Sequence, residues 1–165
     1  MKHDVNDSLS LHSQTTFRIL YWASYLGKSN IVEKIIRQGY SPFVVSFDQK
    51  NSLMAALDGK QLATVELILS FTYIPFHPEK FEKSKLATDS YGNTPLHLAY
   101  KNKMQEEVTR LMKEQGGEAW FKEMANIRNH RGMRAKGMTV NELEENVEPD
   151  YVLVVKEERG DFILK

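Results

Sequence analysis

The sequence has 165 residues, of which 41% are hydrophobic and 27% charged; these proportions are typical of a folded domain or a short repeat array and exclude wholesale disorder. It contains no cysteine, which excludes disulfides, thiolate zinc sites, iron–sulfur clusters and cysteine nucleophiles. Its 22 basic residues balance its 22 acidic residues, so no net charge steers the chain toward nucleic acid or anionic lipid.

Residues 1–14 are polar and predict a flexible leader ahead of the folded part of the chain. They lack the apolar core of a secretory signal and the arginines of a transit peptide. No apolar run approaches the length that spans a bilayer, so we expect no direct membrane insertion. The expected location is the cytoplasm, or the cytosolic face of a membrane protein or large assembly.

An apolar pattern recurs three times in the region that follows. Ala23, Ala56 and Ala99 each have a leucine three residues before them and apolar residues nine, twelve and thirteen residues after them. The first interval is 33 residues and the second is 43, which is the same period with ten inserted residues. The apolar residues after the alanines are Val32, Ile35 and Ile36, then Val65, Ile68 and Leu69, then Val108, Leu111 and Met112.

Each copy of the pattern predicts two helices. The alanine lies on a short first helix, where a small side chain lets a neighbouring helix approach, and the later positions share one face of a second helix. A left-handed residue is expected to end the first helix. Gly27 has this place in the first copy, and we expect Gly59 and Asn102 to take it in the others, because both residue types tolerate that conformation.

The segment DSYGNTPLHLAYKNK, residues 89–103, is similar to the helix-one signature of the ankyrin repeat. Arg18–Tyr21 and Asn51–Met54 stand where that family has Thr-Pro-Leu-His, and GMTVNELE, residues 137–144, resembles its closing repeat. The resemblance covers residues 15–146. It implies an all-α solenoid of about three repeats with a capping helix, in which Thr94 caps a helix and bonds His97.

In the ankyrin family, partners are contacted by hairpin tips and by the exposed ends of the first helices. The resemblance therefore implies a non-catalytic protein–protein interaction module. Tyr25, Phe47 and Tyr91 are the expected anchors, because aromatic residues dominate interface hot spots. Each of the three could instead be a partly buried residue that covers the neighbouring repeat. By position, the implied partner-binding residues are Tyr25, Leu26, Phe47, Asp48, Lys50, Asp58, Ser90, Tyr91, Asn93, Lys101 and Asn102.

Two segments interrupt the period. The first, at about 70–88, carries four aromatic residues and two prolines; it predicts either a finger folded back on the array or an exposed loop that inserts into a partner. The second, 116–136, predicts a short amphipathic helix followed by a basic cluster. The cluster is either a solvated loop that balances the acids of residues 142–150 or a weak patch for phosphate, RNA or an acidic partner. Its members are Arg128, Arg131, Arg134 and Lys136.

Residues 147–165 predict an acidic linker and a short β-hairpin, with a turn at Arg159–Asp161. A lone hairpin is marginal in water, so we expect it to dock on a partner or to continue into a longer polypeptide. This leaves two alternative functions open. The chain could be the cytosolic N-terminal part of a larger channel-like membrane protein or multidomain protein, or it could be a structural subunit of a large assembly.

The sequence offers no motif for catalysis or cofactor binding. It lacks a phosphate-binding loop, a dinucleotide fingerprint, a zinc-protease motif and a calcium loop, and its five histidines have no metal-ligand spacing. His97 already has a structural interpretation in the ankyrin signature. We therefore expect no enzyme activity, no cofactor, no metal and no small-molecule substrate, and a protein partner of unknown identity.

Overall fold

The computed structural model describes residues 4–45, 49–71 and 87–138, and side chains from Ser13 onward. Several predictions lie outside these residues. They concern Phe47, Asp48, most of the aromatic insertion, the closing repeat beyond Met138 and the C-terminal hairpin.

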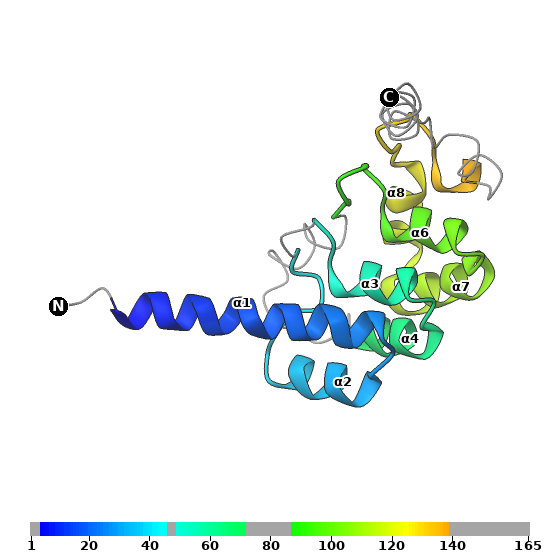
Figure 1. The fold of residues 1–165 in the computed structure, drawn as a ribbon. Coiled ribbons are helices and arrows are strands. Elements are labelled where there is room, and N and C mark those ends of the chain that lie inside the picture. The colour runs from blue at the N-terminus through cyan, green and yellow to red at the C-terminus, as the bar shows by residue number, and fades with distance from the viewer. Residues whose placement is uncertain (1–3, 46–48, 72–86, 139–165) are drawn as a thin grey trace, which may run out of the picture.

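The described chain is a row of helical pairs (Figure 1). Helix α1 (Asp4–Tyr25) pairs with α2 (Ser29–Arg37), α3 (Ser52–Asp58) with α4 (Leu62–Ser70), and α6 (Pro95–Lys101) with α7 (Gln105–Gly116). First helices stack on first helices, α1 on α3 and α3 on α6, while α2, α4 and α7 form a second layer. Helix α8 (Glu118–Asn126) packs on α7, and a 3-10 turn, η2 (Ala135–Gly137), packs on α6. The all-α repeat fold is confirmed.

The periodic apolar positions form the core. Ala23, Ala56 and Ala99 are 6%, 0% and 0% exposed, at the contacts between neighbouring first helices. The apolar positions predicted on all three second helices are buried in the same continuous core. The repeat register deduced from spacing is therefore confirmed. Its physical basis is that each helical pair has too little apolar surface to form a core alone and must bury it against its neighbours.

The reversal after each first helix has the same geometry in all three repeats. Five residues after each alanine, a backbone N–H donates to the alanine carbonyl, at 2.8 Å in every repeat. The residue just before that donor is left-handed: Gly27, Lys60 and Lys103, with φ of 70°, 56° and 60°. Our assignment of this conformation to Gly59 and Asn102 was wrong, because the hydrogen bond sets the reversal at a fixed distance from the alanine.

Gly59 has a different role, which only the packing shows. Its φ is −76°, a conformation that any residue adopts. A Cβ atom at this position would, however, overlap the carbonyl oxygen of Tyr25 at the end of α1. Glycine is therefore needed here for the close approach of two repeats.

Helix α1 is longer than predicted. It begins at Asp4, so residues 4–14, which we expected to form a flexible leader, are its first half. Arg18–Tyr21, which stands where the ankyrin family begins its first helix, lies inside α1, so no helix begins there. Residues 1–26 contain neither glycine nor proline, so nothing in the sequence interrupts the helix. Figure 1 shows the N-terminal half of α1 projecting away from the other helices.

The N-terminal edge of the array exposes apolar side chains. Ile19 and Trp22 are 49% and 55% exposed. Their counterparts one period later, Ser52 and Ala55, are buried against the preceding repeat. In the described chain no helix pair precedes α1, so these two positions stay open to solvent.

Candidate partner-binding surface

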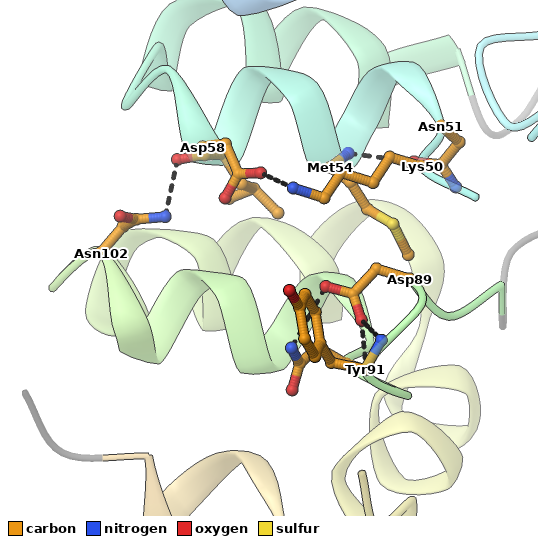
Figure 2. Close-up of polar contacts among 9 residues, drawn as sticks. Lys50, Asn51, Met54, Asp58, Asp89, Tyr91 and Asn102 are labelled. Atoms are coloured by element: carbon orange, nitrogen blue, oxygen red, sulfur yellow. Dashed lines mark hydrogen bonds and ion pairs between the residues drawn. The ribbon is translucent and has the colours of Figure 1, made fainter. Parts of the chain in front are cut away.

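The turn before α6, residues 89–93, is called here the third finger, and its conformation depends on Asp89. Oδ1 of Asp89 accepts hydrogen bonds from the backbone N–H groups of Tyr91 and Asn93, at 2.9 and 2.8 Å. Oδ2 accepts from Nδ2 of Asn93 at 3.1 Å, and Gly92 closes the turn with φ of 75°. Asp89 is 2% exposed, whereas Tyr91 at the tip is 67% exposed (Figure 2). A buried carboxylate therefore presents an aromatic side chain to solvent.

Residues 129–133 repeat this turn and are called here the fourth finger. Oδ1 of Asn129 accepts from the backbone N–H groups of Arg131 and Met133, both at 3.0 Å, at the same two offsets as in the third finger. Gly132 has φ of 75°, as Gly92 does. The segment 116–136, which we predicted to lie outside the period, thus ends in a finger. The sequence signal for it was an Asp or Asn three residues before a Gly in both turns.

The two fingers are joined by hydrogen bonds between backbone and side chains. The N–H of His130 donates to the carbonyl of Tyr91 at 3.0 Å, and Nδ2 of Asn129 donates to Oδ1 of Asn93 at 3.0 Å. A Cβ atom on Gly92 would crowd the backbone and ring of His130. Glycine at position 92 therefore permits both the turn and the close contact between fingers.

His97 connects the third repeat to the fourth finger. Its Nδ1 accepts from the backbone N–H of Thr94 at 3.2 Å, and its Nε2 lies 2.9 Å from the carbonyl oxygen of Met133. Because a carbonyl only accepts, Nε2 carries the proton of the neutral ring. Thr94 in turn caps α6 by accepting from the N–H of His97. The predicted cap and its bond to His97 are confirmed.

Burial keeps His97 neutral. The side chain is fully buried. Desolvation lowers the pKa of His97 below 6.5, and the bond to the Met133 carbonyl and the charge of Asp89 oppose this only in part. A second proton at Nδ1 would also leave the N–H of Thr94 without its acceptor, although Oγ1 of Thr94, 2.8 Å from Nδ1, could accept that proton. The contacts of His97 with Thr94 and with the Met133 carbonyl therefore favour an uncharged imidazole.

A groove of about 430 Å³ opens beside the two fingers and the end of α6. We call it the inter-finger groove. Tyr91 stands at one finger tip, Arg131 at the other, and Lys101 belongs to α6. Two methionines add apolar surface. The described residues that line it are Tyr91, Asn93, Lys101, Asn129, His130, Arg131, Met133 and Met138, and none of these eight is acidic.

A family model for ankyrin repeats, described as three copies, matches residues 20–122, which is more than half of the chain. The chain belongs to the ankyrin-repeat family. Ankyrin repeats are in general protein–protein interaction modules, and the family is typically non-catalytic. A search of curated proteins finds no relative that matches the chain.

Some of the residues that the ankyrin resemblance assigned to partner binding are exposed. Ser90, Tyr91 and Lys101 are exposed around the third finger and the end of α6. Tyr25 and Leu26 are 38% and 58% exposed at the end of α1. Of these two sets, the inter-finger groove brings together Tyr91 and Lys101.

Other predicted residues hold the ankyrin array together. Nζ of Lys50 pairs with Oδ2 of Asp58 at 2.6 Å along α3. Asn93 is 8% exposed and bonded within and between fingers. Nδ2 of Asn102 donates to the carbonyl of Leu57 at 3.1 Å, which joins repeats two and three (Figure 2).

The fourth finger also decides how the predicted basic cluster is arranged. Arg128 and Arg134 face each other across the finger as an isolated antiparallel bridge, and Nη1 of Arg128 donates to the carbonyl of Gly132 at 2.6 Å. Arg131 is the cluster member that lines the groove. Sequence reasoning missed Asn129, His130, Met133 and Met138, because the pairing of this segment with the third repeat depends on contacts between residues 36 apart.

The described part of the ankyrin chain offers neither a metal site nor a membrane-spanning helix. Within residues 4–45, 49–71 and 87–138, no group of histidine and carboxylate side chains is placed to hold a metal ion. Over the same ranges, none of the helices combines the length and the apolar character needed to cross a membrane.

Proposed function

We propose that this chain is a non-catalytic module that binds a protein partner through the inter-finger groove and the finger tips beside it. The observation that carries the proposal is the exposure of Tyr91. A tyrosine that is 67% exposed contributes little to folding, yet Asp89 and Gly92 hold the turn that presents it. A large aromatic side chain on a rigid support is the usual form of an interface hot spot.

The surroundings of Tyr91 support the same function. The two fingers are tied to each other and to α6 by the bonds of His130, Asn129 and His97, so the surface is already ordered before a partner arrives. A preorganised surface loses little conformational entropy on binding. The groove provides concave area next to the tyrosine.

Site-specific photocrosslinking in native cell extract tests this function. A photoreactive phenylalanine analogue at position 91 should form one dominant covalent adduct with a protein. The same analogue at Glu107, exposed on α7 in the second layer, serves as the matched control and should form no such adduct. Equal labelling from both positions, or no adduct at position 91, would contradict the proposal.

A further inference from the structure

We propose that two copies of this chain associate through the exposed side of α1. Along that side and the turn after it run three apolar residues, Ile19, Trp22 and Leu26, which we call the N-terminal stripe. They are 49%, 55% and 58% exposed, and their spacing of three and four residues makes them neighbours on one helix face. The side of α1 that contains Leu20 and Ala23 is buried in the core. The inference goes beyond the proposed function, because α1 and the third finger lie at opposite ends of the stacked first helices.

Neighbouring aromatic rings support Trp22 at the centre of the N-terminal stripe. The rings of Tyr21 and Tyr25 meet its indole edge to face, with ring centroids 5.4 and 5.8 Å away. A large aromatic side chain that is supported in this way needs little ordering on binding. Exposed and supported, Trp22 has the form of an interface hot spot.

The size of its side chains distinguishes the N-terminal stripe from an ordinary contact between repeats. The counterparts of the stripe one period later are Ser52, Ala55 and Gly59. These small residues let α1 approach α3 closely, and a Cβ atom on Gly59 would already overlap the carbonyl oxygen of Tyr25. A leucine at the equivalent place, Leu26, therefore blocks a further helix pair at the spacing of the array. The occupant of the stripe must meet it at a wider spacing, side chain against side chain.

A second copy of the stripe meets this requirement. Two identical faces related by a twofold axis can interdigitate their large apolar side chains, and residues 19–26 contain no lysine, arginine, aspartate or glutamate that would repel its own copy. The pairing also continues an interface that the chain already has. Helix α3 lies between two first helices, α1 and α6, whereas the described chain stacks one first helix, α3, on α1. A second α1 would give each α1 the two neighbours that α3 has.

The projecting half of α1 supplies the further surface that a stable dimer needs. From side-chain size and exposed fraction, the stripe and Tyr25 expose roughly 300–400 Å² in each copy. Two copies would bury roughly twice that area, which is less than the 1,200–2,000 Å² of a stable interface. The N-terminal half of α1 projects from the array (Figure 1), and Arg18 is the single charged residue from residue 8 to residue 26, histidine aside. A projecting helix with so little charge is suited to contact a second α1 along its length.

The test measures the mass and the tryptophan quenching of the full chain as functions of concentration. Sedimentation equilibrium should show the mass of two chains at about 100 μM and approach the mass of one chain on dilution. Trp120, the other of the two tryptophans, is buried, so quenching by acrylamide reports mainly on Trp22. Quenching should be strong in the dilute sample and should fall as the dimer forms.

A matched pair of substitutions locates the contact. Leu26→Glu should raise the dissociation constant of the dimer at least about tenfold, because each copy would bring a carboxylate into the same apolar contact. Leu62→Glu is the control, since Leu62 is also an exposed leucine but lies on α4 in the second layer; it should leave the dissociation constant unchanged. Trp22→Ala should weaken the dimer as Leu26→Glu does. Circular dichroism of each variant confirms that the helices are retained.

Three results would overturn the proposal. The first is the mass of a single chain at every concentration up to about 1 mM. The second is strong protection of Trp22 from acrylamide in the dilute sample, which would mean that another segment of the same chain covers the stripe. The third is equal weakening by Leu26→Glu and Leu62→Glu, which would place the contact elsewhere. Crosslinking at position 91 is measured separately, so the protein-binding function stands or falls independently of the dimer.

Discussion

Replacing His97 with alanine should detach the fourth finger from the third repeat. The substitution removes the hydrogen bond from Nε2 to the Met133 carbonyl and leaves the N–H of Thr94 without the acceptor Nδ1. Each loss costs about 1 kcal/mol, and the buried space left by the imidazole adds a cavity penalty. The expected loss in free energy of unfolding is therefore roughly 2–4 kcal/mol, a large part of the stability of a typical domain.

Two further variants separate the contributions. Thr94→Ala removes the cap of α6 and should cost about 1 kcal/mol. His97→Gln keeps an acceptor at the third position of the helix, as in a capping box, but loses the bond to Met133. Its cost should lie between those of Thr94→Ala and His97→Ala.

Urea unfolding followed by far-ultraviolet circular dichroism measures these differences, and amide hydrogen exchange reports on the finger. Exchange at the N–H of His130, which donates to Tyr91 in the third finger, should accelerate in His97→Ala and less so in Thr94→Ala. A loss below about 1 kcal/mol for His97→Ala, or unchanged exchange at His130, would refute the role assigned to the histidine.

The remaining predictions concern pH, packing and the C-terminal segment. Because burial lowers the pKa of His97, the unfolded state takes up this proton first as pH falls below 6.5; stability should then decrease by at most about 1.4 kcal/mol per pH unit, and His97→Gln should remove that contribution in pH-dependent urea titrations. Ala56→Leu should overpack the stack at a cost of roughly 1–3 kcal/mol, and an unchanged thermal midpoint would mean that the repeat register is misassigned. Gly59→Ala should lower the thermal midpoint because its Cβ overlaps the end of α1, whereas Gly137→Ala, with open space around it, should not; equal effects would contradict the close approach. Deleting residues 151–165 should leave the helical melting point nearly unchanged, and a lower melting point would show that this segment supports the array.

The repeat architecture could be predicted from the sequence because the same physical requirement recurs in every copy. A position where neighbouring helices meet must be small, as at Ala56, and a position facing the second layer must be apolar, as at Val65. The Thr94 cap was also predictable, because a cap depends on residues only three apart. Such local requirements leave a periodic pattern that can be recognised without coordinates.

Contacts between distant residues decided the rest. Lys60 and Lys103 adopt left-handed conformations although Gly59 and Asn102 were better suited by residue type, because the bond to the buried alanine sets where the chain reverses. Helix α1 extends back to Asp4, where the local sequence looked like a polar leader.

The candidate site shows the same division. The sequence by itself determined the repeat and the buried alanines, because they follow from the spacing of apolar residues, and the structure decided between exposure and partial burial of Tyr91. Only the tertiary structure decided that residues 129–133 form a second finger and that Lys101 and Arg131 line one groove. The reason is that the bonds of Asn129 to Asn93 and of His97 to Met133 each join residues 36 apart, and such pairs become neighbours only when the third repeat and the fourth finger stack.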